Sequence, residues 1–432
     1  MSDTDPLAAA REILEQGEPS RAVLSLRSYA DDLPLPDLVA LVRDASRALG
    51  ADDLAAAAAD LLGDIDGPKA LYDFGYAATG SGIPFAGVPA LRRARELAPD
   101  VLPILWELAS ALEDAHRHRD AADALRGWAG ELPAWPGRYL VAYNSFAAGD
   151  LDGARAALAG LPAPQDPDWA PARDRVAAMA ERAAVAAAAG PLDGFDLRGW
   201  HFALHGGVVA HLSPYGFEES MRGRYAFVSD DYSYCRTGLE RLRLVLETAG
   251  RAVDGVMAPP DRDSTVLGLA AARLLDLPLL PVDPARPGVL VVAYDLDDAD
   301  PQLRGALFER PEGQILFEHA ASWVRPSGPA ADVVTLLHQN VHRPWGERMR
   351  MADVEDPSRG VETVPADERP EAELAEEVLA AEALTGENGE GEPPDTVDVL
   401  TGFVGAVAGH WARSARRWRA DTPGPVRSSF FG

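Results

Sequence analysis

The chain has 432 residues, of which 47% are hydrophobic, and a formal net charge of −28 at pH 7. This length indicates two or three domains, and the negative charge excludes non-specific binding to nucleic acid, which depends on Lys and Arg contacts to phosphate. The single cysteine, Cys235, excludes an internal disulfide and any zinc site built from four cysteines.

The N-terminal segment has neither the basic start nor the apolar core of a signal peptide. The apolar stretches of the chain are too short or too interrupted to cross a bilayer. We therefore expect a soluble, cytoplasmic protein without a transmembrane segment.

Residues 1–185 are rich in Ala and Leu at helical spacing, and they contain a repeat. Leu71–Asp100 aligns with Leu105–Ala134 without a gap at an offset of 34 residues, which is the period of tetratricopeptide repeats. The region therefore resembles an all-α solenoid of about four tetratricopeptide-like hairpins, in which small residues such as Gly75 suit the close crossing of paired helices. The alternative is a non-repeating helical bundle. The resemblance implies a concave face that binds a protein partner, whereas the competing interpretation is a region that only packs on the rest of the chain.

Strand and helix patterns alternate in residues 195–350, which predicts an α/β domain with a mainly parallel sheet. Trp200–Leu212 is interpreted as a hairpin around Gly206-Gly207, and the apolar run Gly288–Asp295 is interpreted as a buried strand. Further strands are expected at Val253–Pro260, Gln314–Val324 and Asp332–Gln339, and helices at Arg236–Gly250 and Ser264–Leu277.

The charge of the sequence changes twice after residue 350. Residues 351–395 are crowded with carboxylates and contain no aromatic residue, which predicts a disordered acidic linker with a transient helix at Glu371–Leu384. Residues 396–432 turn basic and carry apolar residues at helical spacing. They are expected to form a basic amphipathic helix and tail, and the helix is expected to dock on a protein partner or on the chain's own acidic surface.

The sequences "VDGVMAPPDRDSTVLGLAAARLLDLPLLPV" and "GVLVVAYDLDD" resemble the central part of type I phosphoribosyltransferases in element order and hydrophobic pattern. The resemblance covers Val253 to Leu303. It implies a pyrophosphate loop at Ala258–Thr265 and a ribose-binding acidic pair at the end of the later strand. The ligand-binding residues that it implies are Asp261, Arg262, Ser264, Thr265 and Asp295.

The residues that would perform phosphoribosyl transfer are altered. Tyr294 stands where one acid of the pair is expected, and the following phosphate loop holds three aspartates and Pro301. Carboxylates repel phosphate, and proline has no N–H to donate to it. We therefore interpret the domain as a degenerate phosphoribosyltransferase-like fold.

The stretch "AYDLDD" is also similar to the first motif of haloacid-dehalogenase-type phosphatases. That resemblance implies Asp295 as nucleophile and Mg²⁺ ligand, and Asp297 as general acid/base. No lysine follows in the chain, and Ala299 stands where the motif has Thr. We favour a simpler interpretation, in which Asp300 caps a helix whose first residue is Pro301. A weak cation site at the aspartates is a further alternative.

Six of the nine histidines lie between His201 and His342. A zinc site made of histidines alone lacks a tight spacing signature, and we favour partly buried rings; the residues considered are His201, His205, His211, His338 and His342. Cys235 is interpreted as a small half-buried residue before a helix rather than as a catalytic thiol.

These patterns together predict a non-catalytic adaptor or regulatory protein. Its helical repeats would bind a protein partner, and its α/β domain would be a pseudo-enzyme scaffold without a cofactor. The alternative is a divergent phosphoribosyltransferase or Mg²⁺-dependent phosphatase that uses the Asp295 cluster. Phosphate ligands need several cations or inward-pointing amides, and the candidate loops offer only Arg262 and Arg304 against many aspartates.

Overall fold

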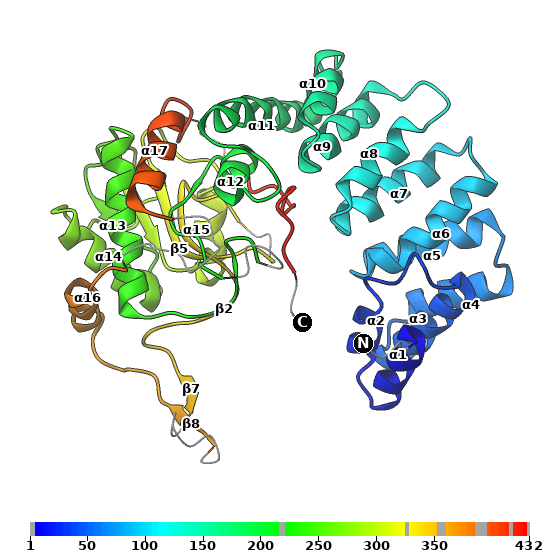
Figure 1. Ribbon diagram of the computed structural model, residues 1–432, viewed down its shortest axis with the longest axis horizontal. Coiled ribbons are helices and arrows are strands. Elements are labelled where there is room, and N and C mark those ends of the chain that lie inside the picture. Colours follow the sequence, from blue (N-terminus) through cyan, green and yellow to red (C-terminus); the bar gives the residue numbers. More distant parts are fainter. Residues whose placement is uncertain are drawn as a thin grey trace. The chain divides into compact units, whose positions relative to one another are not determined.

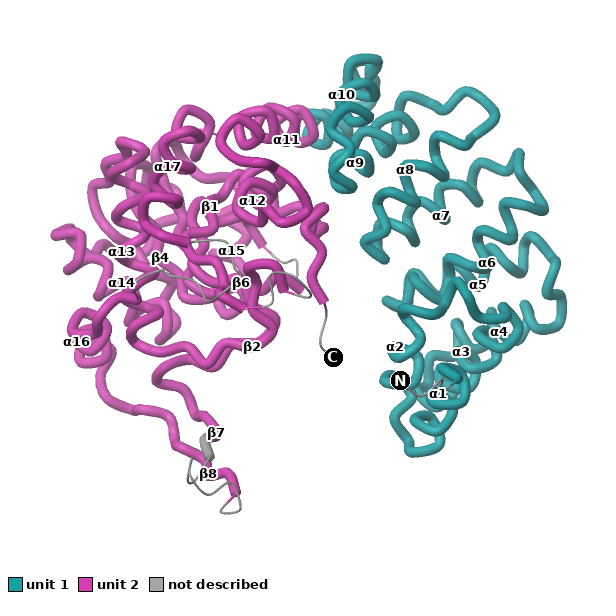
Figure 2. Tube along the Cα trace, viewed as in Figure 1, with its two compact units in different colours: residues 1–173 teal, residues 174–432 magenta. Residues whose placement is uncertain are grey.

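The computed structural model describes residues 5–215, 221–324, 328–351, 360–384, 395–413 and 418–429. The chain divides into two compact units, Met1–Arg173 and Asp174–Gly432 (Figure 2). Among the described residues, no helix is both long enough and apolar enough to cross a membrane.

Unit 1 is built from consecutive helical hairpins (Figure 1). The two helices of each hairpin pack together, and each hairpin packs on the next. Corresponding helices of neighbouring hairpins begin 34 residues apart, at Pro68 and Leu102 and at Pro84 and His118. The helices are α1 (Pro6–Glu15), α2 (Pro19–Leu24), α3 (Leu35–Leu49), α4 (Asp52–Gly63), α5 (Pro68–Gly80), α6 (Pro84–Leu97), α7 (Leu102–Asp114), α8 (His118–Arg126), η1 (Ala134–Arg138), α9 (Tyr139–Ala147), α10 (Leu151–Ala159), η2 (Pro167–Trp169) and α11 (Ala170–Ala189).

The predicted helical character of this region is confirmed, while its assignment to the tetratricopeptide family stays a prediction. Proline occupies the first or second position of several of these helices, where its fixed φ suits a helix start and its missing N–H costs no hydrogen bond. The unit ends within α11, somewhat before the boundary expected at residue 185.

Helices α5 and α6 cross closely because glycines face each other at the crossing. A Cβ atom at Gly75 would lie 2.4 Å from Leu91 Cγ, and one at Gly87 would lie 2.9 Å from the Gly75 carbonyl oxygen. The Cβ at Gly87 would contact a backbone atom, and a backbone atom cannot move away by changing rotamer as a side chain can. The crossing therefore depends on both glycines.

Unit 2 contains a six-stranded sheet in which every pairing is parallel, in the order β1-β6-β5-β4-β3, with β2 pairing β6 further along the same edge as β1. The predicted mainly parallel sheet is therefore confirmed. Strands β4 and β5 are buried along their whole length, as expected for a parallel sheet covered on both faces. The strands are β1 (Val208–Val209), β2 (Tyr225–Ser229), β3 (Val256–Met257), β4 (Leu290–Ala293), β5 (Ile315–Ser322) and β6 (Val333–His342).

Helix α13 (Tyr232–Thr248) contacts β5 and β6, and α14 (Arg262–Leu274) contacts β3 and β4. Outside these, α16 packs on α13 and α14, and α17 packs on α13. The remaining elements are α12 (Leu197–His205), η3 (Leu296–Asp298), α15 (Pro301–Ala306), α16 (Glu371–Ala380), α17 (Val397–Val407) and an antiparallel hairpin of β7 (Arg348–Met351) and β8 (Val361–Val364).

The structure corrects two expectations about these elements. The hairpin expected at Trp200–Leu212 is wrong, because its first half belongs to α12; Asp196 caps that helix and Gly206, at φ 79°, ends it. The linker expected to be disordered at 351–395 contains an ordered helix, α16, in the segment where only a transient helix was expected, and this helix buries an apolar stripe against α14. The stripe consists of Leu374, Ala375 and Val378. Residues 352–359 and 385–394 of that linker lie outside the described residues.

The C-terminal helix docks on its own chain, through apolar residues rather than through basic ones. Leu400, Val404 and Val407 of α17 are buried, and the Trp411 indole donates a hydrogen bond to the Asp332 carbonyl oxygen at 2.9 Å. Of the two expected docking sites, a partner or the chain's own acidic surface, the structure shows docking on its own chain, but on an apolar surface rather than an acidic one. Docking on a partner stays a prediction, and Arg416 and Arg417 lie outside the described part of the chain.

A buried carboxylate, Asp395, fixes the start of this C-terminal segment. Its oxygens lie 2.6 Å from a guanidinium nitrogen of Arg198 and 2.5 Å from one of Arg241, and His211 Nδ1 lies 3.4 Å away. Its Oδ2 also accepts a hydrogen bond from the Leu212 N–H at 3.0 Å. Burial raises the pKa of Asp395, but His211 and the two guanidinium groups outweigh burial and hold the pKa well below its usual range.

We expect Gly87→Ala to destabilise unit 1 by about 1–3 kcal/mol, because the new Cβ overpacks the helix crossing. Denaturant titration of the full chain followed by circular dichroism measures this change. Gly80→Ala is the matched control, since a Cβ there meets nothing within 4 Å, and it should be neutral or stabilising by up to about 1 kcal/mol. Equal effects of the two substitutions would contradict the close crossing.

We expect Asp395→Asn to destabilise unit 2 by about 3–5 kcal/mol, because two buried guanidinium groups lose their counter-charge. The carboxylate contributes this stability above its unfolded pKa of about 3.9 and loses it as the pH falls toward its lower folded pKa. Thermal unfolding at several pH values should therefore show the variant converging on the wild type in acid. Asp398→Asn, at an exposed position of α17, should change stability by less than about 1 kcal/mol; a comparable loss there would remove the special role of Asp395.

Candidate functional site

The carboxyl edge of the parallel sheet carries most of the polar side chains that the sequence pointed to. Asp230 and Asp231 follow β2, and Tyr294 and Asp295 follow β4. The loop after β3 leads to Asp261 at the start of α14. Ligands of open α/β folds bind at this edge, so it is the candidate site of unit 2.

The strand register divides these side chains between the two faces of the sheet, because neighbouring residues in a strand point to opposite sides. Glu318 pairs with Ala293 and His338 pairs with Ser322, so Glu318, His338 and Asp295 share one face, which we call the acidic face. Tyr294, His319 and Thr335 share the other, which we call the α13 face because Gly238 of α13 lies against His319 and Thr335. Asp230, two residues beyond Val228, belongs to the α13 face.

On the acidic face, Asp295 and Glu318 are both buried. Asp295 Oδ1 accepts a hydrogen bond from the Asp297 N–H at 2.9 Å, and its Oδ2 lies 3.9 Å from His338 Nε2. Glu318 Oε1 accepts from the Leu296 N–H at 2.9 Å. Burial, reinforced by the Asp295 carboxylate, raises the pKa of Glu318 to about 8. Glu318 is thus a carboxyl group that carries a proton near neutral pH, and no sequence motif pointed to it.

The residues expected in the pyrophosphate loop lie at the start of α14, where they form hydrogen bonds with protein groups. Asp261 caps the helix by accepting from the Ser264 N–H at 2.8 Å, and the Thr265 hydroxyl donates to the Asp261 carbonyl oxygen at 2.7 Å. Ser264 Oγ accepts from the Tyr294 N–H at 3.1 Å. The guanidinium of Arg262 donates to two carbonyl oxygens of the segment before α16, at residues 367 and 369.

The aspartates after β4 also make local contacts. The Asp300 carboxylate accepts from the N–H groups of Gln302 and Leu303, and Pro301 is the first residue of α15. The helix-cap interpretation of this stretch is therefore confirmed. Asp297 lies 3.8 Å from a guanidinium nitrogen of Arg304.

A buried polar cluster that the sequence did not reveal lies on the α13 face. Asp230 Oδ2 accepts a hydrogen bond from the Tyr294 hydroxyl at 2.6 Å. The same oxygen lies 3.1 Å from His319 Nε2 and 3.5 Å from Cys235 Sγ, and the nitrogen and sulfur are 3.8 Å apart. Burial, and then the neighbouring Asp230 carboxylate, raises the pKa values of the Cys235 thiol and the Tyr294 hydroxyl.

Local sequence explains how the cluster forms. Asp231 caps α13 by accepting from the Tyr234 N–H, so Cys235 lies one turn into the helix and faces the sheet. His319 comes from the middle of β5. The one signal in the sequence is the pair Asp230-Asp231 before an amphipathic helix that contains the only cysteine.

Arg343 and Trp345, from the loop after β6, cover the edge above Tyr294. The Arg343 guanidinium lies 5.6 Å from the centre of the Tyr294 ring and forms ion pairs with Asp263 and Asp298. The buried Trp345 indole donates to Asp263 Oδ1 at 2.5 Å. The positive charge of Arg343 is therefore already paired with carboxylates.

Within the described ranges, the group of three metal-ligating side chains whose ligand atoms lie within 4.8 Å of one another is Asp230, Cys235 and His319. The pair Asp295 and Asp297 is not part of such a group. The histidines considered for a zinc site do not converge either: the His201 and His205 rings pair on α12, with centroids 4.7 Å apart, while His211 contacts Tyr225 and Asp395.

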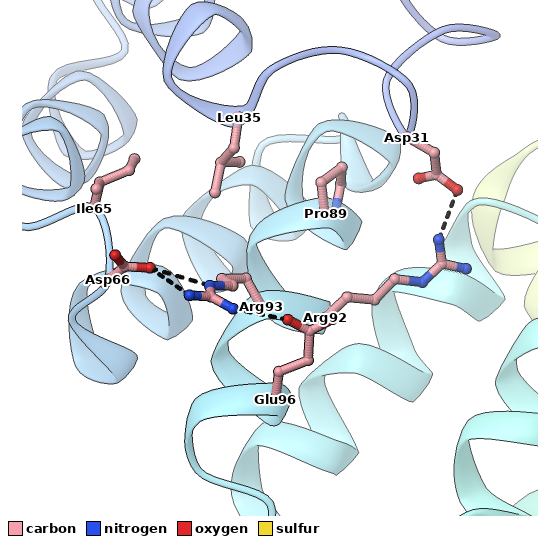
Figure 3. A pocket seen from close by; sticks show the side chains of 8 residues that line it. All are labelled: Asp31, Leu35, Ile65, Asp66, Pro89, Arg92, Arg93 and Glu96. Carbon is pink, nitrogen blue, oxygen red and sulfur yellow. Dashed lines mark hydrogen bonds and ion pairs between the residues drawn. The ribbon is translucent and has the colours of Figure 1, made fainter.

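Unit 1 has its own candidate site, a surface pocket of about 330 Å³ (Figure 3). Apolar side chains from the start of α3, the turn before α5 and the middle of α6 surround it, together with charged side chains that pair across it. Arg92 pairs with Asp31 at 2.7 Å, and Arg93 pairs with Asp66 at 2.9 Å. The lining residues are Asp31, Leu35, Ile65, Asp66, Pro89, Arg92, Arg93 and Glu96.

We expect Glu318→Gln to stabilise unit 2 at neutral pH by about 1–3 kcal/mol. The wild-type carboxyl keeps its proton in the folded state up to about pH 8, so its folded state loses stability as the pH rises from about 4.3, the unfolded pKa, toward about 8. Glutamine keeps the acceptor for the Leu296 N–H and has no proton to lose. Melting temperatures measured from pH 4 to 8 should therefore diverge with rising pH.

Glu312→Gln, at an exposed glutamate before β5, is the control for this experiment and should follow the wild-type pH profile. A Glu318→Gln profile parallel to the wild type would show that Glu318 does not hold its proton in the folded chain.

Comparison with protein-family models finds no match to the chain, and comparison with curated proteins finds none either. No family assignment therefore adds roles to the residues described above. The functions of the two units have to be inferred from their own contacts, burial and charge.

Proposed function

We propose that the protein is a non-catalytic protein-interaction adaptor. Unit 1, a tetratricopeptide-like solenoid, binds a protein partner, and unit 2, a degenerate phosphoribosyltransferase-like domain, is a pseudo-enzyme scaffold. The observation that carries this proposal concerns the hydrogen bonds at the carboxyl edge of the sheet. There, the residues that the resemblance assigns to a phosphoribosyl ligand hydrogen-bond to protein groups instead.

Electrostatics at the same edge support the proposal. A phosphate ligand requires cations or inward-pointing amides, and Arg262 already donates to carbonyl oxygens while Arg343 is paired with two carboxylates. The three aspartates after Asp295 add negative charge where the 5′-phosphate would lie. A phosphorylated substrate would have to displace the ion pairs of Arg343 and also overcome repulsion from these aspartates.

The pocket of unit 1 supports the binding role. Its volume lies at the lower end of the range for small-ligand pockets and suits one or two side chains of a bound peptide. Its apolar walls, formed by Leu35, Ile65 and Pro89, are flanked by charges of both signs. This combination favours a partner segment with an apolar residue next to charged ones.

The alternative function is an enzyme of phosphate chemistry that uses Asp295, with Mg²⁺ as cofactor. One observation favours it, namely Glu318, whose raised pKa beside Asp295 suits a general acid or base. Burial of both carboxyl groups argues against it, because a substrate needs access to them.

Calorimetric titration of the full chain with phosphoribosyl pyrophosphate, nucleotides and Mg²⁺ separates the two functions. An adaptor should release no binding heat with any of these ligands. Mg²⁺-dependent binding that Asp295→Asn abolishes, and that the matched Asp300→Asn variant retains, would establish the enzyme instead. Asparagine at position 300 still caps α15, so this control leaves the local helix intact.

A further inference from the structure

We propose that unit 2 contains a buried zinc site with three protein ligands, Asp230, Cys235 and His319. The inference is independent of the adaptor proposal, because it concerns the α13 face of the sheet and neither the acidic face nor unit 1. The site would hold the first turn of α13 against β5.

The separations of the three ligand atoms fit three corners of a tetrahedral ion, whose fourth ligand does not come from this group of side chains. Zinc bonds of about 2.3 Å to sulfur and about 2.1 Å to nitrogen or oxygen place the ligand atoms about 3.3–3.6 Å apart. The three distances within the cluster are 3.1 Å between oxygen and nitrogen, 3.5 Å between oxygen and sulfur, and 3.8 Å between nitrogen and sulfur. Sulfur, the largest of the three atoms, makes the two longest edges, as an ion at the centre requires.

The three ligands come from three separate elements that the fold holds rigidly. Asp230 follows β2, Cys235 lies in the first turns of α13, and His319 lies within β5. A Cβ at Gly238, three residues after Cys235, would lie 2.8 Å from His319 Nδ1. Helix α13 therefore approaches the His319 ring as closely as a glycine permits. This approach places the Cys235 thiol next to His319 Nε2.

The orientation of Asp230 is set by a neighbouring contact. Its Oδ1 accepts a hydrogen bond from the Asp231 N–H at 2.9 Å, which leaves Oδ2 directed at the cluster. The Tyr294 hydroxyl donates to Oδ2 at 2.6 Å. Hydrogen bonds of this kind orient the ligating carboxylates of metal centres.

The donor set and its charge also favour zinc. Thiolate, imidazole and carboxylate together are typical zinc ligands, whereas Mg²⁺ and Ca²⁺ prefer oxygen alone. A divalent ion with one thiolate and one carboxylate makes a neutral centre, which a fully buried position requires. Cys235, His319 and the Asp230 side chain are all fully buried.

The same burial argues against a catalytic Cys-His-Asp arrangement. A nucleophilic thiol has to reach a substrate, and neither Cys235 nor His319 exposes any surface. A metal-free hydrogen-bonded cluster is the remaining competitor, and metal content distinguishes it from the zinc site.

The test uses the full chain, unfolded in denaturant with chelator and then refolded with Co²⁺ or with Zn²⁺ alone. We expect about one metal ion per chain and, with Co²⁺, a thiolate-to-cobalt charge-transfer band in the near ultraviolet. Because Cys235 is the only cysteine, such a band in a monomeric sample identifies it as a ligand without any substitution. Cys235→Ser and His319→Gln should each reduce occupancy to below about 0.1 ion per chain.

His338→Gln is the matched control, a buried histidine on the acidic face of the same sheet, and it should keep the ion and the band. Refolded wild-type protein with no thiolate band would overturn the proposal, whatever the folding of the variants. Metal that persists in both Cys235→Ser and His319→Gln would overturn it as well, because the ion would then lie elsewhere.

Discussion

The buried ion pairs of Asp395 are the constraint on which unit 2 depends. The carboxylate joins Arg198 of α12 to Arg241 of α13, and the same guanidinium groups donate to the carbonyl oxygens of residues 209 and 210 at β1. One side chain near the end of the chain thus holds the edge strand, two helices and the start of α17 together. Removing one partner of a buried ion pair typically costs about 3–5 kcal/mol, so each of these elements depends on the others for its stability.

The pleat of the sheet determines which polar side chains lie together on each of its two faces. Tyr294 and Asp295 are neighbours in sequence, as are Glu318 and His319, yet each pair is split between the two faces. The acidic run after β4 therefore does not act as one cluster: Asp295 lies near Glu318, and Asp300 serves as a helix cap. The residues that do converge come from places far apart in the sequence.

The features of the fold that depend on local periodicity could be predicted from the sequence. The features that depend on contacts between distant residues could not. Helices at the 34-residue spacing, the parallel sheet and the Asp300-Pro301 cap all follow from neighbouring residues. Helix α12 was mistaken for a strand because apolar Trp200, Phe202 and Leu204 alternate with other residues before Gly206-Gly207, which is also the pattern of a hairpin strand. Helix α16 was expected only as a transient helix, because the average acidity of its segment conceals a short apolar stripe that packs against the domain.

The cluster of Asp230, Cys235 and His319 was beyond sequence reasoning for another reason: His319 lies 84 residues after Cys235, and the register of β5 and β6 brings it into place. The Asp395 network spans an even longer separation, with consequences for biosynthesis. Unit 1 makes contacts between neighbouring hairpins and can fold progressively as the chain leaves the ribosome. Unit 2 cannot pair Arg198 and Arg241 with Asp395 until residue 395 has left the ribosome. The edge strand of its sheet is therefore completed only after the other strands of that sheet have been synthesised.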